Sequence, residues 1–420
     1  MPASSPATPR ISAARTAGTA LFLLTSLNLF NFIDRYILPG VQPLVQKDFA
    51  INDAQTGLLT TVFFFVYMIA APLTGWLGDH LPRKPLIVIG ALLWSIATLF
   101  TAWVHSYETL LIRHAIVGIG EATFSIFAPA LLADFYPEAD RNRVLSIFYI
   151  TIPVGGALGY LTGGILGQRY GWRMPFFIAA LPGVLIALAF YFLVREPQRG
   201  SADSLAPTLN RTTLSGLTRN PAFWTATLGL AMWTFAVGGI STWLPTYLVR
   251  FASMSVAKAG TVAGALTVLC GLLGTIAGGW LGQRWQRRDH RALYLLSAWG
   301  SILAIPFAAA VFFGPPSFFI PGAFLAEFFL FLGTGPLNAA IVNSIAAPIR
   351  ATAISVNLFV IHALGDAFSP HLIGRVSDAT NLRIGLSITL IALVASGIIL
   401  FAGSRFAPVL TPSTSSTNAA

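Results

Sequence analysis

Long apolar stretches separated by short polar connections dominate the pattern along the chain. Each stretch is continuous over about 20 residues, the length that an α-helix needs to cross the hydrocarbon core of a bilayer. A transmembrane β-barrel would instead show segments of about ten residues with alternating polarity. The pattern predicts an all-α membrane protein with twelve spanning helices, at roughly 18–43, 56–78, 85–104, 107–134, 141–167, 173–195, 221–250, 257–282, 291–313, 317–346, 350–376 and 383–405.

The longest hydrophilic segment divides the predicted helices into two sets of six. The first residues are rich in Ser, Thr, Ala and Arg, as transit peptides are, but we favour an uncleaved cytoplasmic tail. The predicted parts are a disordered cytoplasmic tail at 1–17, an N-terminal six-helix bundle at 18–195, a cytoplasmic linker at 196–220, a C-terminal six-helix bundle at 221–405 and a disordered cytoplasmic tail at 406–420.

The composition excludes several other classes of protein. Of the 420 residues, 55% are hydrophobic and 10% are charged, and the mean hydropathy is +0.74. A typical soluble domain carries about 25% charged residues, so a soluble enzyme and a disordered protein are both excluded. No nucleotide-binding loop, zinc pattern or catalytic triad stands out. We therefore expect neither enzymatic activity nor a cofactor.

Basic residues gather on one side of the predicted helices. With the N-terminus placed in the cytoplasm, 16 of the 25 lysine and arginine residues fall in cytoplasmic segments and 7 on the opposite side. The other two, Arg35 and Arg113, lie inside helices. Because cytoplasmic loops are enriched in Lys and Arg, we predict that both termini are cytoplasmic. This distribution explains the net charge of +10 without any binding to nucleic acid.

Two similar decapeptides occupy matching places in the two halves of the chain. Residues 75–84 read GWLGDHLPRK, and residues 279–288 read GWLGQRWQRR. Each falls between the second and third predicted helix of its half. Because each half has an even number of helices, the repeat predicts two parallel bundles that rock about a central site.

The first decapeptide resembles the signature between helices 2 and 3 of the major facilitator superfamily. His80 and Pro82 stand where that signature has Arg and Gly. The resemblance implies two pseudo-symmetric six-helix bundles and a conformational latch, in which Asp79 pairs with Arg141 or Arg143 or caps a helix N-terminus. The candidate latch residues are Gly75, Asp79, Arg83, Lys84, Arg141 and Arg143.

Further segments resemble the Spinster-like subfamily of these transporters. Its more specific marks are the Asp-Arg pair in the first helix and the Arg-x7-Glu-Ala pattern in the fourth. The resemblance implies transport of lysophospholipids, sphingosine phosphate and related single-chain amphiphiles. The matching segments are NFIDRY (31–36), KDFAINDAQTGLLTTVFFFVY (47–67), LIRHAIVGIGEATFSIFAPALLADFYP (111–137) and GWR (171–173).

Ionisable side chains inside a bilayer are costly, which makes each of them a candidate for function. Because a helix rises 1.5 Å per residue, depth follows from position in the sequence. Counted from Leu21, Asp34 lies about 20 Å into the bilayer, and counted from Tyr107, Arg113 lies about 9 Å from the opposite side. In a core about 30 Å thick these two residues reach the same depth. Glu121 lies about 12 Å deeper along its helix.

Helices 1 and 4 line the central cavity in this superfamily, so we expect a polar cluster of Asp34, Arg35, Arg113 and Glu121. Burial favours a neutral carboxyl group, whereas a nearby guanidinium favours the charged form. Rocking that separates an acid from its arginine would load a proton, and closing the pair would release it. These four residues are the proton-coupling candidates. The alternative is a permanent salt bridge that holds helix 1 to helix 4.

Other polar and aromatic residues are candidates for binding the substrate. An amphiphilic lipid needs an apolar wall for its chain and an arginine for its phosphate, although contact with bilayer lipid explains the same aromatic residues. The ionisable groups of the C-terminal half need not converge, so we expect no metal; an interhelical contact and a substrate or proton contact both stay open. The predicted substrate-binding residues are Arg35, Arg113, Asn31, Phe64, Tyr67, Trp233, Glu327, His362 and Asp366.

These observations together predict a secondary transporter that works by alternating access. We expect it to be coupled to protons, to move a single-chain amphiphilic lipid, and to be a monomer in a bacterial inner membrane. One alternative is a proton-coupled carrier of organic anions or hydrophobic drugs. Another is a passive lipid-conducting protein or a receptor, which would need no titrating pairs within the membrane.

Overall fold

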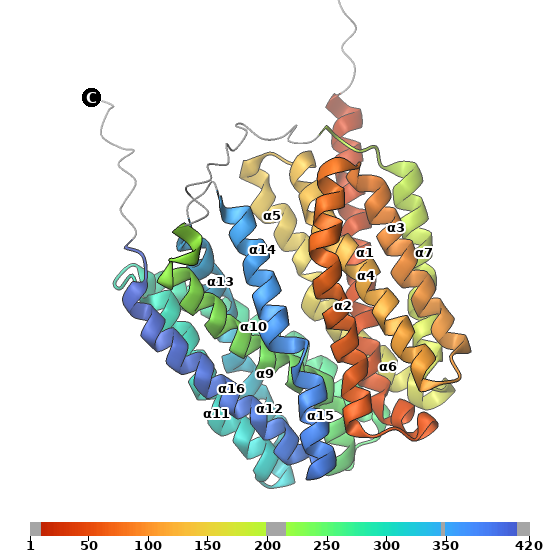
Figure 1. Cartoon of the computed structure of the whole chain (residues 1–420), viewed down its shortest axis with the longest axis vertical. Helices are drawn as coiled ribbons and strands as arrows, with labels where there is room; N and C mark the ends of the chain where they lie inside the picture. Colours follow the sequence, from red (N-terminus) through yellow and green to blue (C-terminus); the bar gives the residue numbers. More distant parts are fainter. Residues whose placement is uncertain (1–9, 199–215, 346–348, 410–420) are drawn as a thin grey trace, which may run out of the picture. The chain divides into compact units, whose positions relative to one another are not determined.

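The computed structural model of the chain describes residues 10–198, 216–345 and 349–409 (Figure 1). These residues are almost wholly helical and contain no strand. Within these residues, 12 helical segments are long and apolar enough to cross a membrane. The predicted fold class, an all-α polytopic membrane protein with twelve spans, is confirmed.

The first six spans follow the sequence prediction, and most of their ends agree within a few residues. Their helices are α1 (Arg10–Phe49), α2 (Asp53–His80), α3 (Arg83–Phe100), α4 (Tyr107–Phe135), the pair α5 (Glu138–Tyr149) and α6 (Thr151–Tyr170), and α7 (Met174–Leu193).

The last six spans contain two interruptions that the apolar pattern does not reveal. The predicted helix at 317–346 is divided at Gly333, and the one at 350–376 contains a π-helical turn, His362–Asp366, in which Gly365 leaves helical geometry. The helices are α9 (Pro221–Phe251), α10 (Val256–Gln286), α11 (Ala292–Phe313), α12 (Phe319–Leu332), α13 (Thr334–Asn343), α14 (Arg350–Ile361), α15 (Ser369–Ala379) and α16 (Leu382–Gly403).

Contacts within the chain define two compact units. Unit 1 comprises the described residues of 1–206, 241–268 and 370–385, and unit 2 comprises those of 207–240, 269–369 and 386–420. Unit 1 therefore includes the first six spans together with the last turns of α9, the first turns of α10 and most of α15. Each unit has its own apolar core.

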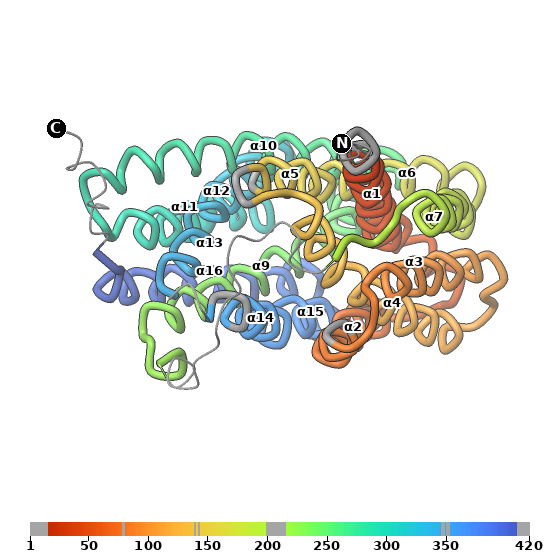
Figure 2. Tube along the Cα trace, turned by 90° about the horizontal axis from the view of Figure 1, so that it is seen from above, coloured from red at the N-terminus to blue at the C-terminus, as the bar shows by residue number. Residues whose placement is uncertain are grey.

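Close packing of α6 on α1 organises unit 1 (Figure 2). A Cβ atom added at Gly155 would lie 2.7 Å from the Cβ of Phe32, and one at Gly163 would lie 2.8 Å from the carbonyl oxygen of Ile37. Only glycine lets the two backbones approach so closely. Helix α1 is thereby held in a fixed position against α6.

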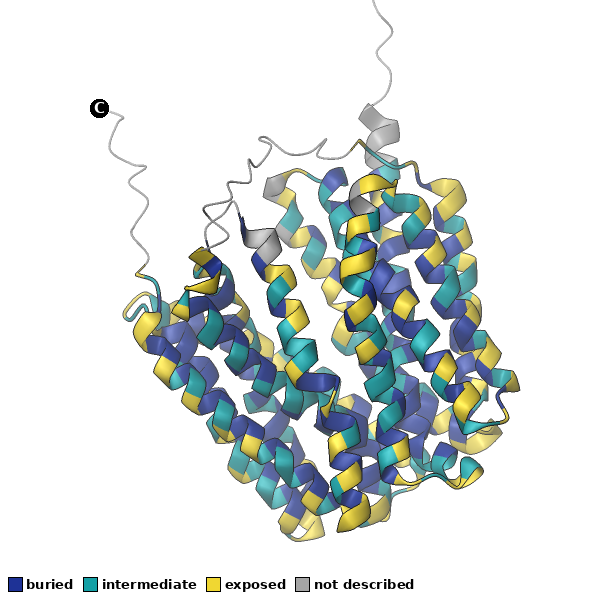
Figure 3. Cartoon of the chain, in the orientation of Figure 1, coloured by how far each residue is buried: buried dark blue, intermediate teal, exposed yellow. Residues whose placement is uncertain are grey.

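Exposed residues occur along the helices (Figure 3), and many of them are large and apolar. Phe22, Ile112, Phe192 and Ile391 are examples, and Phe192 is 77% exposed. Such side chains would be unfavourable in water, and they fit contact with lipid tails.

Two adjacent glycines in α10 test how tightly unit 2 is packed. A Cβ atom at Gly278 would overlap the carbonyl oxygen of Leu332 in α12, whereas one at Gly279 would have no heavy atom within 4 Å. We expect Gly278→Ala to lower the melting temperature of the purified protein, because overpacking costs about 1–3 kcal/mol. Gly279→Ala should leave it unchanged or raise it, since alanine favours a helix by about 1 kcal/mol. Equal melting temperatures for the two variants would contradict this packing.

Candidate functional site

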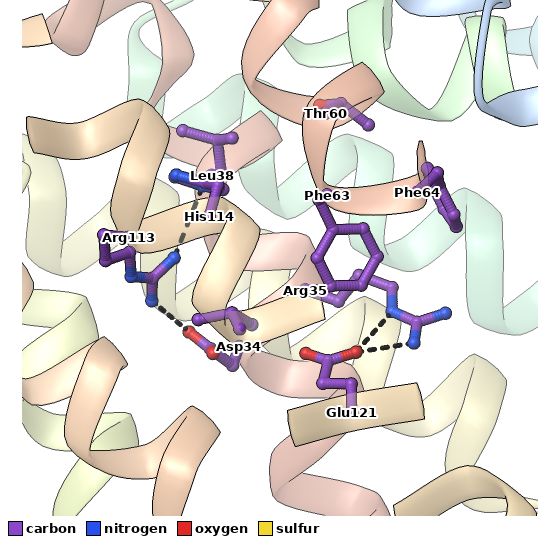
Figure 4. Close-up of a pocket in the computed structure, with 10 residues that line it drawn as sticks. Asp34, Arg35, Leu38, Thr60, Phe63, Phe64, Arg113, His114 and Glu121 are labelled. Carbon is purple, nitrogen blue, oxygen red and sulfur yellow. Dashed lines mark hydrogen bonds and ion pairs between the residues drawn. The ribbon is translucent and has the colours of Figure 1, made fainter. Parts of the chain in front are cut away.

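Four charged side chains from α1 and α4 surround one small cavity in unit 1 (Figure 4). They are Asp34 and Arg35 from α1 and Arg113 and Glu121 from α4. The cavity has a volume of about 30 Å³, which is room for about two water molecules. The residues that we expected to form one polar cluster thus lie together, with two acids and two bases that nearly neutralise one another.

Asp34 and Arg113 form a buried ion pair between α1 and α4. Nη2 of Arg113 donates to Oδ1 of Asp34 at 3.1 Å and to the hydroxyl of Thr98 at 2.7 Å. The Thr98 hydroxyl donates in turn to Asp34, and Nε of Arg113 donates to the carbonyl of Ala97 at 3.3 Å. Asp34 is 4% exposed and Arg113 is 5% exposed. The contact agrees with the equal depths that the sequence predicts for these two residues.

Arg35 and Glu121 form the second ion pair. Nε and Nη2 of Arg35 donate to one oxygen of Glu121, Oε2, at 3.0 and 2.5 Å. Glu121 is fully buried, whereas Arg35 is 18% exposed. The guanidinium carbon of Arg35 lies 4.9–5.7 Å from the ring centres of Phe32, Phe63, Phe64 and Tyr67. Such contacts add a cation–π attraction.

Two buried polar groups beside these ion pairs have no hydrogen-bond partner among the described residues. One is the second carboxylate oxygen of Glu121, Oε1, and the other is the amide of Asn31. A buried polar atom without a partner costs about 1–3 kcal/mol. Glu121 lines the cavity, so water or a bound molecule there could supply the missing partner.

Not every polar residue on this face of α1 reaches the cavity. The side-chain amide of Asn28 donates to the hydroxyl of Thr151 at 2.7 Å and to the carbonyl of Phe148 at 3.1 Å. Asn28 therefore ties α1 to α5 and α6. His114 does line the cavity, and its Nδ1 lies 2.8 Å from the carbonyl oxygen of Leu110.

The candidates in the C-terminal half lie in unit 2 and do not form one cluster among its described contacts. His362 and Asp366 bond to each other at 2.8 Å across the π-helical turn. The indole nitrogen of Trp233 donates to the carbonyl of Leu330 at 3.0 Å. Glu327 is 8% exposed, and its Oε2 has no partner in the described part of the chain. No group of three His, Cys, Asp or Glu side chains in that part could hold a metal ion.

The residues proposed as a latch have partners that the sequence did not reveal. Arg83 forms an ion pair with Asp134 at the end of α4. The carboxylate of Glu196 accepts from the backbone N–H groups of Arg83 at 2.6 Å and Lys84 at 3.1 Å, so Glu196 caps the N-terminus of α3. That type of contact was predicted for Asp79.

The remaining latch candidates are only partly described. Arg141 donates to the backbone carbonyls of Ala133 and Tyr136. Arg143 is exposed, and Gly75 has open space around it. The side chain of Asp79 lies outside the described residues.

A polar cluster around Asp53, at the start of α2, was missed entirely. Two nitrogens of Arg250, from the end of α9, donate to the carboxylate of Asp53 at 2.7 and 2.6 Å. Gln46 of α1 and Ser377 of α15 donate to the same carboxylate at 2.7 and 2.5 Å. Asp378 accepts from the backbone N–H groups of residues 53 and 54 at 2.9 and 2.8 Å.

The sequence signal that marks the start of α2 is local. Asn52 and Gln55 form a capping box that marks the start of α2, and the pattern of an amide or hydroxyl residue followed three positions later by Glu or Gln is typical of a helix N-terminus. The partners Arg250 and Ser377 are 197 and 324 positions away from Asp53. No spacing rule connects residues so far apart.

Comparisons with known proteins agree on one family. Residues 24–370 match the model of the Major Facilitator Superfamily. Protein spinster homolog 1 of Homo sapiens is 34% identical over 400 residues, covering 88% of this chain and 75% of that protein. Protein spinster homolog 3 of Danio rerio is 32% identical over 403 residues (90% and 81%). Sphingosine-1-phosphate transporter SPNS2 of Xenopus tropicalis is 32% identical over 382 residues (87% and 74%).

Solved structures show the same fold. A crystal structure of a bacterial homolog of the human lysosomal transporter Spinster, in an inward-facing and unoccupied conformation, matches with a TM-score of 0.85 and 24% identity. It covers 95% of this chain and 98% of the other. The inward-facing, occupied conformation matches with a TM-score of 0.80 and 25% identity, covering 92% and 96%.

The burial of the Asp34–Arg113 pair predicts that removing one charge destabilises the protein more than removing both. Asp34→Asn leaves a buried guanidinium without its counter-charge, which typically costs about 3–5 kcal/mol. Adding Arg113→Gln removes the second charge, so the double variant should melt at a higher temperature than Asp34→Asn alone.

The exposed pair of Asp48 and Arg173, 2.9 Å apart, is the control. Asp48→Asn should cost no more than about 1 kcal/mol. Additive losses from Asp34→Asn and Arg113→Gln would show that the pair is not coupled.

Proposed function

The chain belongs to the major facilitator superfamily and, within it, to the Spinster transporters, and from this premise we propose that it is a proton-coupled secondary transporter of single-chain amphiphilic lipids. It is a multi-pass membrane protein of a transporter family, not an enzyme. The observation that carries the proposal is the pair of acid–arginine contacts around one water-sized cavity.

The surroundings of Arg35 support a phosphorylated amphiphile as the substrate. A guanidinium binds phosphate through paired, charge-assisted hydrogen bonds, and Arg35 is the more exposed of the two arginines at the cavity. The aromatic rings around it offer an apolar wall for the first part of a hydrocarbon chain. One relative carries the name of a sphingosine-1-phosphate transporter. Sphingosine-1-phosphate is a phosphorylated single-chain amphiphile.

Competition between Glu121 and a substrate phosphate for Arg35 supports coupling between the substrate and a proton. Among the described residues, Arg35 donates both hydrogen bonds that the Glu121 carboxylate accepts. A phosphate that binds Arg35 would compete with Glu121 for the guanidinium. A fully buried carboxylate that loses its counter-charge takes up a proton, because an isolated buried charge is very costly. Head group and proton would therefore enter the site together.

Alternating access supplies the remaining step. The cavity is too small for a lipid head group, so the site must widen before substrate enters. The relatives solved in occupied and unoccupied inward-facing conformations are consistent with such a cycle. We further propose that the protein acts as a monomer, that both termini face the cytoplasm of a bacterial inner membrane, and that the six-helix bundles divide at the 196–220 linker.

The coupling role of Glu121 is tested in proteoliposomes with a fluorescent lysophospholipid. We expect Glu121→Gln to abolish accumulation driven by a pH gradient, because the side chain can no longer exchange a proton, while equilibration without a gradient continues. Glu108→Gln is the matched control, since Glu108 is an exposed residue in the first turn of the same helix. Gradient-driven accumulation by Glu121→Gln at the wild-type level would reject the proposed coupling.

The same assay separates the alternatives. A passive lipid conductor would show a lipid flux that a pH gradient does not change. A receptor would show no lipid flux with or without the gradient. A carrier of organic anions or hydrophobic drugs would show gradient-driven uptake of those compounds, and they would displace the lysophospholipid.

The Asp53 cluster supports a gate at the end of the pathway opposite to the proposed cytoplasmic latch. Its carboxylate joins α1, α2, α9 and α15 at one point of unit 1. These elements come from both halves of the sequence. If the halves rock, contacts of this type must break and re-form in each cycle.

Opening of this gate is tested by the reactivity of an introduced thiol. In a Cys270→Ala background, Thr246→Cys places a thiol at a fully buried position in α9. We expect Asp53→Asn to increase its rate of labelling by a membrane-impermeant maleimide several-fold, because the ion pair with Arg250 no longer holds the gate. Asp48→Asn, at the same end of unit 1, should leave the rate unchanged. Equal rates in all three proteins would mean that Asp53 does not control access.

A further inference from the structure

The outer face of α10 in unit 2 carries two hollows that follow one another along the helix. The first is an apolar groove of about 590 Å³ between α10 and α12, lined by Leu273, Ile276 and Trp280 of α10 and Phe324 and Phe328 of α12, among others. The second is a hollow of about 310 Å³, lined by Arg284, Trp285 and Arg288 together with Leu281 and Leu296. The first is wholly apolar, and the second is basic.

The spacing of the lining residues places both hollows on one helix face. Leu273, Ala277, Trp280 and Arg284 are separated by three or four positions, so they form one stripe on α10. Arg288, which lies two residues beyond the end of the helix, extends this stripe by lining the second hollow. From Leu273 to Arg284 the helix rises about 16 Å, which is half of a hydrocarbon core about 30 Å thick. The stripe therefore matches one leaflet of the bilayer, with its arginines at the end where lipid head groups lie.

The arginines in this stripe have no carboxylate partner in the described part of the chain. No ion pair involves Arg284 or Arg288 there. The guanidinium of Arg284 lies 5.9 Å from the ring centre of Trp280. Arginine beside tryptophan at the end of a spanning helix is typical of the interface between hydrocarbon and head groups.

The internal repeat allows the charge of this region to be compared with that of its counterpart in the first half. In the first copy, Arg83 is paired with Asp134. In the second copy, Gln283 stands where the first copy has Asp79, and three arginines follow at 284, 287 and 288. The second copy thus carries more positive charge than its counterpart and holds it beside an apolar groove.

We propose that this face of α10 is a binding site for an anionic phospholipid of the surrounding bilayer. One acyl chain lies in the groove between α10 and α12, and the phosphate contacts Arg284 and Arg288. Basic pockets beside apolar surfaces at the membrane interface favour lipids with a net negative head group. A choline head group adds a positive charge that these arginines repel. The site is separate from the charged cavity in unit 1, and it does not depend on the transport cycle.

Lipid binding to the purified, delipidated protein in detergent tests the site. Native mass spectrometry measures the affinity for phosphatidylglycerol and for phosphatidylcholine with the same acyl chains. We expect wild type to prefer phosphatidylglycerol. Arg284→Gln should weaken that binding about fivefold, since a basic residue at the membrane surface contributes about 1 kcal/mol. It should leave phosphatidylcholine unchanged, whereas Trp280→Ala should weaken both lipids because it shortens the groove.

Arg287→Gln is the matched control, because Arg287 has the same charge in the same segment but lines neither hollow. It should retain wild-type preference for phosphatidylglycerol. Equal losses from Arg284→Gln and Arg287→Gln would overturn the proposal in favour of diffuse surface charge. Equal affinity of wild type for both lipids would overturn it as well, and so would a concentration-dependent dimer that Trp280→Ala abolishes. Unchanged melting temperatures show that the variants are folded, since Trp280 and Arg284 are exposed.

Discussion

The placement of charge inside the membrane depends on two ion pairs between α1 and α4. Charged groups in a bilayer are tolerated when they are paired, and here each acid meets an arginine from the other helix. Asp34 and Arg35 are adjacent, so their side chains leave α1 about 100° apart. One reaches Arg113 and the other reaches Glu121, eight positions further along α4. This double contact fixes both the rotation of α1 and its height relative to α4.

Tight packing on the other side of α1 makes that geometry rigid. The glycines of α6 let the α1 backbone approach closely, and Asn28 adds hydrogen bonds to α5 and α6. Helix α1 is therefore held between a steric contact on one side and an electrostatic contact on the other. This packing explains why Gly155, Gly159 and Gly163 of α6 are glycines.

The spans could be predicted from sequence because they follow from the cost of polar groups in a bilayer. The charged cluster needed the family resemblance as well, because the resemblance implied that helices 1 and 4 line one cavity. Continuous apolar stretches give the helices, and depth counted at a fixed rise brings Asp34 and Arg113 to the same level. The capping of α3 by Glu196 and the partners of Asp53 could not be predicted. These contacts join helix ends that are distant in sequence, and they depend on how the helices pack. The π-helical turn at His362–Asp366 was not predicted either, because it leaves the apolar pattern of the helix unchanged.

The two ion pairs differ in ways that fit a structural role for one and the proposed coupling role for the other. Arg113 is almost fully buried, and Asp34, Thr98 and the carbonyl of Ala97 all accept hydrogen bonds from it. Breaking this pair would leave several buried groups without partners at once. Arg35 is more exposed and makes its ion pair with one oxygen of Glu121, while the other oxygen has no described partner. A contact that is incomplete at a cavity costs less to exchange for a phosphate than one that is saturated. We infer that Arg113 holds the framework and that Arg35 is the arginine that changes partner.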